Sequence, residues 1–349
     1  MRSRAGAGAW PRSLAPWAWS LRLRLAWQAA FTTLFAVLLL RSVDLDQLGS
    51  AVEGIEAAWV VPALLLFTAA KYIDSWRWRY LLRGLGTALP QRALFGAFLI
   101  GNMANNLLPL RIGDVAKIQV LANRYGASRA GLAASVFIVE ASLDGLVFVL
   151  FLLTALAFGE IGELSTVTQG AVISLAAVAL ALFAAAVVFS RTMTAHEAGW
   201  LARLPSGLRG SAARVAGQTR TGLEALRIWP RTAGAIALSA PAWLVEAGMF
   251  ALFGRAFDLG LSFPTFIAVM VAANLAVAIP IAFWNFGPYE ALVSGVLVAA
   301  GVEQSTAVSY AISVHVLSSL WIVGSGLVAF WALGINPREV FSIRRVGEH

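Results

Sequence analysis

Long apolar segments separated by short polar ones run along most of the chain. Ten of them lie at residues 25–41, 57–82, 93–108, 114–122, 130–158, 169–190, 232–256, 263–282, 287–300 and 305–333. Crossing the hydrocarbon core of a bilayer, about 30 Å thick, takes roughly 20 residues of α-helix. Backbone groups in lipid form their hydrogen bonds within their own segment, so each spanning segment is a helix. The pattern predicts an all-α fold, a polytopic transmembrane helical bundle.

Two pairs of these segments contain members that are too short to span the membrane comfortably. The segments 93–108 and 114–122 are joined by Leu-Pro-Leu-Arg-Ile-Gly, and the segments 263–282 and 287–300 by Trp-Asn-Phe-Gly. Interrupted hydrophobic segments at corresponding places in two halves are typical of the central site of a transporter. We therefore predict two re-entrant helical hairpins and six spanning helices. If both hairpins cross fully, the count becomes ten.

The two halves of the chain, about 57–158 and 229–333, share their spacings. A tryptophan precedes the proline of each hairpin by 50 residues in the first half and 51 in the second, the pairs being Trp59 with Pro109 and Trp229 with Pro280. The helix 169–190 between the halves would turn the second half upside down. The sequence thus predicts an inverted repeat, as in alternating-access carriers, within one transmembrane domain over residues 25–333.

Composition and charge agree with a membrane protein and exclude several other classes. Hydrophobic residues make up 59% of the chain and charged residues 13%, and the mean hydropathy is +0.77; soluble domains are far more polar. The absence of cysteine excludes disulfides, thiol catalysis and cysteine-ligated metals. The formal net charge of +8 is scattered between hydrophobic segments, so we expect no nucleic-acid partner.

The loop charges predict the orientation, because cytoplasmic loops are rich in Lys and Arg. The basic residues 1–24 and the tail 334–349 are expected in the cytoplasm of a cell with an inner (plasma) membrane, and the acidic loops 42–56 and 159–168 outside. A group of arginines at and beyond the end of the second segment marks a return to the cytoplasm: Arg77, Arg79, Arg83 and Arg92. The stretch 198–228 resembles an amphipathic helix lying on anionic inner-leaflet lipids.

The densest polar stretch at membrane depth runs from Asn102 to Lys117 and includes Asn105, Asn106, Arg111 and Asp114. Pro109 is expected to end one short helix and Gly113 to start the next, whose free backbone amides favour an anion. Arg111 lies at this break, and its planar guanidinium matches a phosphate, with Lys117 as a second charge. The alternative is that Asp114 caps the helix and pairs with Arg111 or Lys117.

Further polar residues lie in the helices that follow the two hairpins. Glu140 and Asp144 are four residues apart and share one helix face. They could serve as a proton-accepting pair or as counter-ions to Arg111 and Lys117. Asn285, Glu290 and His315, with Asn274, recur at related positions of the second half, and a packing role for His315 stays open. Glu246 fits a packed salt bridge or a protonated carboxyl as well as a ligand contact. No metal-ligand spacing and no Ser-His-Asp grouping is present, so no metal and no cofactor is expected.

The chain resembles the transmembrane region of lysylphosphatidylglycerol synthase, a flippase-like family of membrane proteins. The resemblance rests on residues 106–114, Asn-Leu-Leu-Pro-Leu-Arg-Ile-Gly-Asp, on Glu140 with Asp144, and on residues 286–290, Phe-Gly-Pro-Tyr-Glu. It implies movement of a lipid, often with an anionic or modified head group, between leaflets. Members that synthesise aminoacylated lipids use a separate cytosolic domain, which is not found in these 349 residues.

Three functional hypotheses follow. The first is a lipid flippase that moves a phosphate-bearing lipid, anionic, modified or polyprenyl-linked, by alternating access. The second is a membrane-embedded lipid-modifying enzyme with Glu140, Asp144, Glu290 or His315 as acid and base. The third is a non-transporting partner of a glycosyltransferase or lipid-modifying enzyme. No catalytic signature supports the second, so the sequence favours a transporter over an enzyme.

Overall fold

Helices account for all the regular structure in the residues that the computed structural model describes, which are 55–84, 86–107, 112–136, 141–157, 229–278, 285–335 and a few positions between 180 and 213. No strand occurs in these ranges, which confirms the all-α fold. Three of the helices are long and apolar enough to cross a membrane: Ala57–Arg83, Ala233–Ala256 and Gln304–Ala332. The predicted segment 25–41, and most of 169–190 and 198–228, lie outside the described residues.

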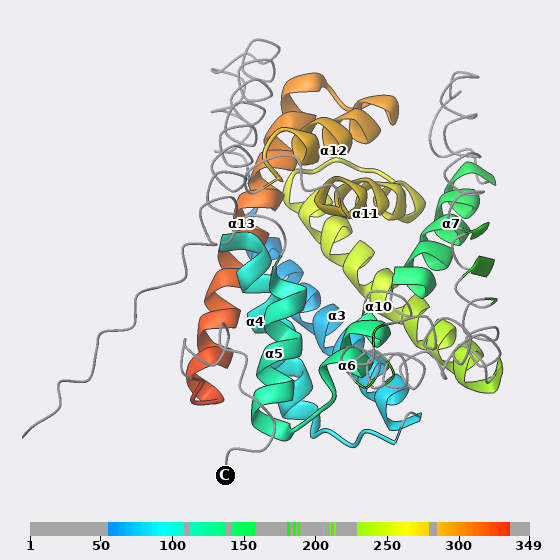
Figure 1. Cartoon of the computed structure of the whole chain (residues 1–349). Helices are drawn as coiled ribbons and strands as arrows, with labels where there is room; N and C mark the ends of the chain where they lie inside the picture. The colour runs from blue at the N-terminus through cyan, green and yellow to red at the C-terminus, as the bar shows by residue number, and fades with distance from the viewer. Residues whose placement is uncertain are drawn as a thin grey trace, which may run out of the picture.

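The centre of the bundle is an antiparallel pair of long helices, α3 (Ala57–Gly84) and α10 (Trp229–Ala256). At one end the Glu56 amide donates to the Ala256 carbonyl over 3.0 Å, and at the other the Tyr80 ring lies against Gly234. Small residues let the two helices approach closely, because Ala63 and Ala247 are both fully buried in the same apolar cluster. Figure 1 shows the pair running through the middle of the molecule.

Two pairs of short helices pack around this centre. In the first half these are α4 (Gln91–Leu107) and α5 (Gly113–Tyr125), and in the second α11 (Phe263–Ala278) and α12 (Pro288–Ala299). At 1.5 Å per residue even the longest spans only about 26 Å, less than the hydrocarbon core. Their lengths agree with the predicted hairpins, whereas re-entry and the inverted repeat stay predictions.

The helices that follow the hairpins exchange partners between the halves. The short α6 (Arg129–Ala134) leads from α5 towards α7 (Ala141–Ala157), which packs against α11. The second hairpin is followed by α13 (Gln304–Ala332), which packs against α4. Each half thereby supports the first hairpin helix of the other, with α13 beside α4 at the left of Figure 1 and α7 at the right. Both hairpins are therefore packed against the same central framework.

The first hairpin is closed tightly at its break. A Cβ atom added to Gly113 would overlap the carbonyl oxygen of Gly101, so only glycine fits where α5 begins. The Asn105 side-chain oxygen accepts a hydrogen bond of 2.7 Å from the Gly113 amide. The predicted start of the second short helix is confirmed. The capping role suggested for Asp114 is wrong, because Ile112 is the N-cap and the side chain that accepts from the first turn is that of Asn105.

Candidate functional site

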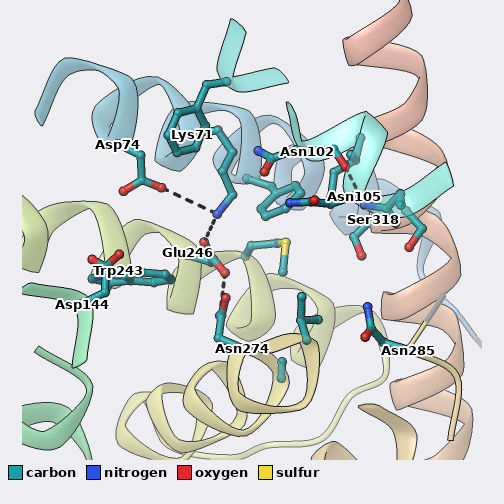
Figure 2. Close-up of a pocket in the computed structure, with 18 of the residues that line it drawn as sticks. Lys71, Asp74, Asn102, Asn105, Asp144, Trp243, Glu246, Asn274, Asn285 and Ser318 are labelled. Carbon is teal, nitrogen blue, oxygen red and sulfur yellow. Dashed lines mark hydrogen bonds and ion pairs between the residues drawn. The ribbon is translucent and has the colours of Figure 1, made fainter. Parts of the chain in front are cut away.

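A polar cavity of about 350 Å³ lies between the central helices and both hairpins. Side chains from α3, α4, α5, α7, α10, α11, α12 and α13 line it, and Figure 2 shows several of them directed into the same hollow. Most of the site residues predicted from the sequence are among them: Asn102, Asn105, Asn106, Asp114, Lys117, Asp144, Asn285 and His315. Helices from both halves of the chain thus build one site. Arg111 and Glu140 lie outside the described residues.

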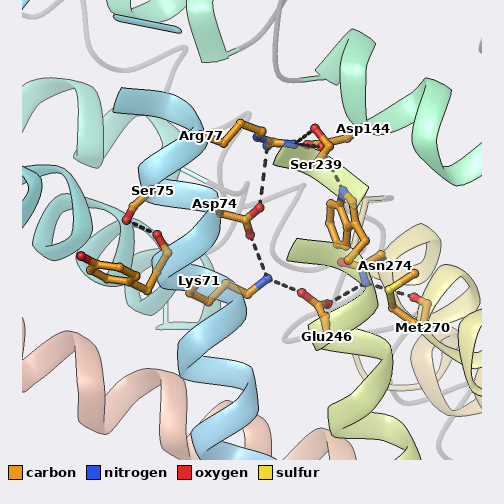
Figure 3. A network of polar contacts seen from close by, with 11 residues as sticks. Lys71, Asp74, Ser75, Arg77, Asp144, Ser239, Glu246, Met270 and Asn274 are labelled. Carbon is orange, nitrogen blue, oxygen red and sulfur yellow. Dashed lines mark hydrogen bonds and ion pairs between the residues drawn. The ribbon is translucent and has the colours of Figure 1, made fainter. Parts of the chain in front are cut away.

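An ion pair between the two central helices forms part of the cavity wall. Lys71 Nζ on α3 lies 2.5 Å from Glu246 Oε2 on α10, and the Asn274 amide on α11 donates to the other carboxylate oxygen over 2.8 Å (Figure 3). The Lys71 ammonium also lies over the rings of Phe67 and Trp243, 5.0 and 5.5 Å from their centres. A packed salt bridge, one of the roles considered for Glu246, is therefore what the structure shows.

Arg77 forms a second buried ion pair, with Asp144 on α7. Both terminal nitrogens of the guanidinium donate to the Asp144 carboxylate, one of them over 3.3 Å, and Nη1 also donates to the Ser239 hydroxyl over 2.8 Å. The Trp243 indole donates to the same carboxylate over 3.2 Å. Arg77 is 2% exposed, so its charge is buried inside the helix bundle. Asp144 is a counter-ion, as expected, but its partner is Arg77 instead of Lys117.

Lys117 lies in the first hairpin at the opposite wall of the cavity. Its ammonium is 3.0 Å from the Asp114 carboxylate and lies over the Phe98 and Trp78 rings, 4.7 and 5.2 Å from their centres. The predicted alternative of an Asp114 pair with Lys117 is thus confirmed. The Asp114 side chain is 27% exposed, so this pair is more open than those of the central helices.

The second hairpin places a buried histidine and carboxylate beside the cavity. His315 Nδ1 on α13 lies 2.6 Å from Glu290 Oε1 on α12. The other Glu290 oxygen accepts from the Gly287 amide over 2.6 Å at the start of α12, and the His315 ring stacks on Tyr289 with 4.1 Å between centres. Glu290 is fully buried and reaches the cavity through His315. Asn285 adopts a φ of 59° at this hairpin tip, a conformation that asparagine tolerates.

A second hollow, almost wholly apolar, lies on the other side of α13. This groove of about 860 Å³ runs between α3, α4 and α13, with Arg92 at α4's first turn among residues such as Phe95, Leu320 and Val328. Neighbouring residues of α13 face different hollows, since Ser318 lines the cavity and Leu317 the groove. The Trp321 indole donates to the Thr68 hydroxyl over 2.7 Å and ties α13 to α3. A polar and an apolar hollow therefore lie side by side.

Comparison with known proteins identifies the family. The family model described as lysylphosphatidylglycerol synthase TM region matches residues 25–326, most of the chain. The chain belongs to this family. No curated protein and no solved structure matched the chain. Membership in the lysylphosphatidylglycerol synthase transmembrane family shows a membrane protein related to lipid synthesis or flipping.

In this family member the sequence did not predict that polar residues of the central helix α3 belong to the site. Lys71, Asp74 and Arg77 all line the cavity, although they stand inside a segment recognised only by its hydrophobicity. Their spacing of three residues was a usable signal, because residues three apart share a helix face. Asn274 was noted only for its position, and it proves to hold the Glu246 carboxylate.

Proposed function

We propose that this member of the lysylphosphatidylglycerol synthase transmembrane family moves a phosphate-bearing lipid between leaflets by alternating access. The observation that supports the proposal best is the pair of adjacent hollows, one polar and one apolar, on the two sides of α13. A lipid has the same division into a charged head group and apolar chains. A water-soluble substrate has no apolar chains to bind in the groove.

The polar cavity suits the head group. Lys117 supplies a cation whose Asp114 partner is partly exposed, and Arg111 follows Pro109 in the sequence just before α5. Asn102 and Asn105 add neutral amides to the same wall. The amide nitrogen of Asn102 is buried and has no hydrogen-bond partner, so it is available to a phosphate oxygen. A buried donor without a partner is costly, which favours a ligand there.

The apolar groove suits the lipid chains. Its lining is leucine, valine, phenylalanine, tryptophan, alanine and glycine, with Thr68, Ser325 and Arg92 as exceptions. Chains held there remain in an apolar environment while the head group crosses, so the transfer avoids exposing them to the polar cavity. Arg92, in the first turn of α4, offers a positive charge for a phosphate at that end of the groove.

The exchange of partners between the halves suits alternating access. Both hairpins line the cavity, and each leans on the helix that follows the other hairpin. Rocking of one half against the other would open the cavity to one leaflet at a time. The proposal includes an inner-membrane location with both termini cytoplasmic, and contact of residues 198–228 with anionic inner-leaflet lipids.

Reconstitution tests the proposal. The purified chain is reconstituted in phosphatidylcholine vesicles that contain fluorescently labelled phosphatidylglycerol, and a membrane-impermeant reductant is added outside. Label from the inner leaflet should lose its fluorescence faster in these vesicles than in vesicles without protein. Lys117→Gln should slow this at least tenfold, a rise of about 1.4 kcal/mol in the activation free energy of transport. The matched control is Arg124→Gln, an exposed charge on the same helix. Equal rates with and without protein would contradict the proposal.

The buried pair of Glu290 and His315 favours a second candidate, a lipid-modifying enzyme. A carboxylate that orients a histidine at the edge of a cavity is an arrangement used in acid–base catalysis. Mass spectrometry of the lipids recovered from the same vesicles separates the two functions. A transporter returns the labelled lipid unchanged, and an enzyme converts it.

A further inference from the structure

We propose that Asp74 on α3 is a proton-binding site coupled to the lipid site. The protonated form of Asp74 binds the lipid phosphate more tightly than the ionised form, so lipid and proton cross together. This inference rests on the proposed function and names its coupling ion. The charges around the cavity, the contacts of Asp74 and its place in the lining carry the argument.

The charges of the lining do not balance. Among the residues that the structure describes, three cationic side chains and four carboxyl groups line the cavity: Lys71, Arg77 and Lys117, with Asp74, Asp114, Asp144 and Glu246. An uncompensated charge buried in an apolar surrounding is unfavourable, and a carboxylate avoids it by binding a proton. One carboxyl group of the lining is therefore expected to be protonated.

The contacts single out Asp74 as that group. Lys71 reaches Asp74 at only 3.7 Å, against 2.5 Å to Glu246. Arg77 reaches it at 3.9 Å but forms its two-pronged contact with Asp144. Both cations thus direct their hydrogen bonds to other carboxylates (Figure 3). Asp74 is 4% exposed, and its Oδ1 atom is buried without a hydrogen-bond partner.

The other ionisable groups around the cavity have partners of their own. On the described part of α10 and α7 these are Glu246 and Asp144, which hold the two α3 cations. From α5, Lys117 and Asp114 pair with each other, and from α13 His315 pairs with Glu290 of α12. Helix α4 contributes no ionisable side chain to the described lining. Its lining residues are Phe98 and the neutral amides Asn102, Asn105 and Asn106.

The position of Asp74 links the proton to the lipid. Asp74 lines the same cavity as Lys117 and lies one helical turn from each of the two α3 cations. A lipid phosphate entering the cavity adds a negative charge to a lining that already has one carboxyl group in excess. Protonation of Asp74 removes that repulsion, and by linkage the bound phosphate favours the proton.

The first experiment follows the proton directly. Infrared spectra of the purified full-length chain, recorded over a series of pH values, should show the carbonyl stretch of a protonated carboxyl group that disappears in Asp74→Asn. The matched control is Asp258→Asn, the same change at an exposed carboxylate, which should keep the band. Absence of the band from the parent, or its persistence in Asp74→Asn, overturns the proposal. This test stands even if no lipid is transported.

The second experiment follows the coupling. Short-chain phosphatidylglycerol, whose phosphate stays ionised, should bind the parent chain more tightly as pH falls, by up to tenfold per pH unit for one linked proton. A pH gradient across labelled vesicles should change the transport rate. Asp74→Asn, which mimics the protonated group, should bind the probe with a pH-independent affinity and ignore the gradient.

Three outcomes overturn the proposal while leaving lipid transport intact. They are equal pH dependence in the parent and in Asp74→Asn, a response to a sodium gradient in place of a pH gradient, and transport by the parent that ignores both. If Asp74→Asn does not fold, the parent alone still decides. The probe is then added to the parent chain in weakly buffered solution with an indicator dye, which reports protons taken up by the protein on binding. Absence of proton uptake at every pH refutes the site.

Discussion

The Lys71 ammonium on α3 lies 2.5 Å from the Glu246 carboxylate on α10, near the middle of both helices. The pair is buried, with 12% of the Lys71 side chain and 5% of the Glu246 side chain exposed. It joins the most extensively packed helices of the described structure at the wall of the polar cavity. The charges that shape the cavity therefore also hold the framework against which both hairpins pack.

Removing one member of this pair should destabilise the protein. Glu246→Leu leaves the Lys71 ammonium without its nearest carboxylate, and breaking a buried ion pair costs about 3–5 kcal/mol. The double variant Lys71→Met/Glu246→Leu places two apolar side chains at the interface and should recover most of that loss. Thermal unfolding of the three proteins in detergent measures the difference. Equal losses from the single and double variants would mean that the pair contributes no coupling.

The helix pattern of this chain was readable from its sequence because hydrophobic length is a strong signal. Segment 57–82 became α3, Ala57–Gly84, and segment 93–108 became α4, Gln91–Leu107. The start of α5 was also readable, since Gly113 stands where the helix begins and meets another backbone too closely for a side chain. Predictions of where helices lie were thus accurate, because they depend on neighbouring residues.

The pairing of charges was not readable, because it depends on contacts between distant residues. Asp144 was expected to serve Lys117 or Arg111, yet its partner is Arg77, 67 residues earlier in the chain. Arg77 itself resembled a loop charge, since it stands near the end of an apolar segment and beside Arg79. Only the packing of α7 and α10 around α3 decides that its guanidinium points inward.

The tight closure of the first hairpin should make Gly113 intolerant of substitution. In Gly113→Ala the added methyl group would overlap the Gly101 carbonyl oxygen and the Asn105 side chain, and such overpacking costs about 1–3 kcal/mol. Gly295→Ala is the matched control, because a Cβ atom at Gly295 on α12 meets nothing within 4 Å. Thermal unfolding should separate the two variants. A Gly113→Ala protein as stable as Gly295→Ala would show that the helices do not approach as described.

Glu303, just outside the span of α13, should make stability depend on pH. Its carboxylate accepts hydrogen bonds from the Ser305 hydroxyl and the Thr306 amide, which hold the pKa of Glu303 below its ordinary value of 4.5. A lowered pKa in the folded state stabilises the protein above pH 4.5, and this stabilisation declines as the pH falls through the folded-state pKa. The melting temperature of the parent should exceed that of Glu303→Gln at neutral pH. The gap should shrink on acidification, and a constant gap would contradict the assignment.

The loop charges give a topology that cysteine labelling can check, since the chain has no native cysteine. Ser50→Cys should react with a membrane-impermeant thiol reagent added outside intact cells, because 42–56 is an acidic loop and expected outside. Ser206→Cys should react only after the cells are opened. The reverse pattern would turn the proposed orientation upside down.

The apolar groove should lose its role in transport when it is filled. Gly324 on α13 lines the groove, and a Cβ atom there meets nothing within 4 Å. Gly324→Leu should therefore fold, since leucine favours the helix over glycine, while its side chain occupies the space assigned to a lipid chain. The rate of labelled phosphatidylglycerol transport should fall in the order parent, Gly324→Ala, Gly324→Leu, because the methyl group fills less of the groove.

The matched control for the groove is Gly295→Leu. Gly295 also stands in an exposed turn of a helix with open space around its Cβ position, but it lines neither the groove nor the cavity. Both leucine variants should melt at or above the parent temperature, and only Gly324→Leu should transport slowly. Parent-like transport by a stable Gly324→Leu protein would remove the lipid chains from the groove. The head-group cavity would then need another path for the chains, because the polar residues around Lys71 and Glu246 cannot accept them without a large desolvation cost.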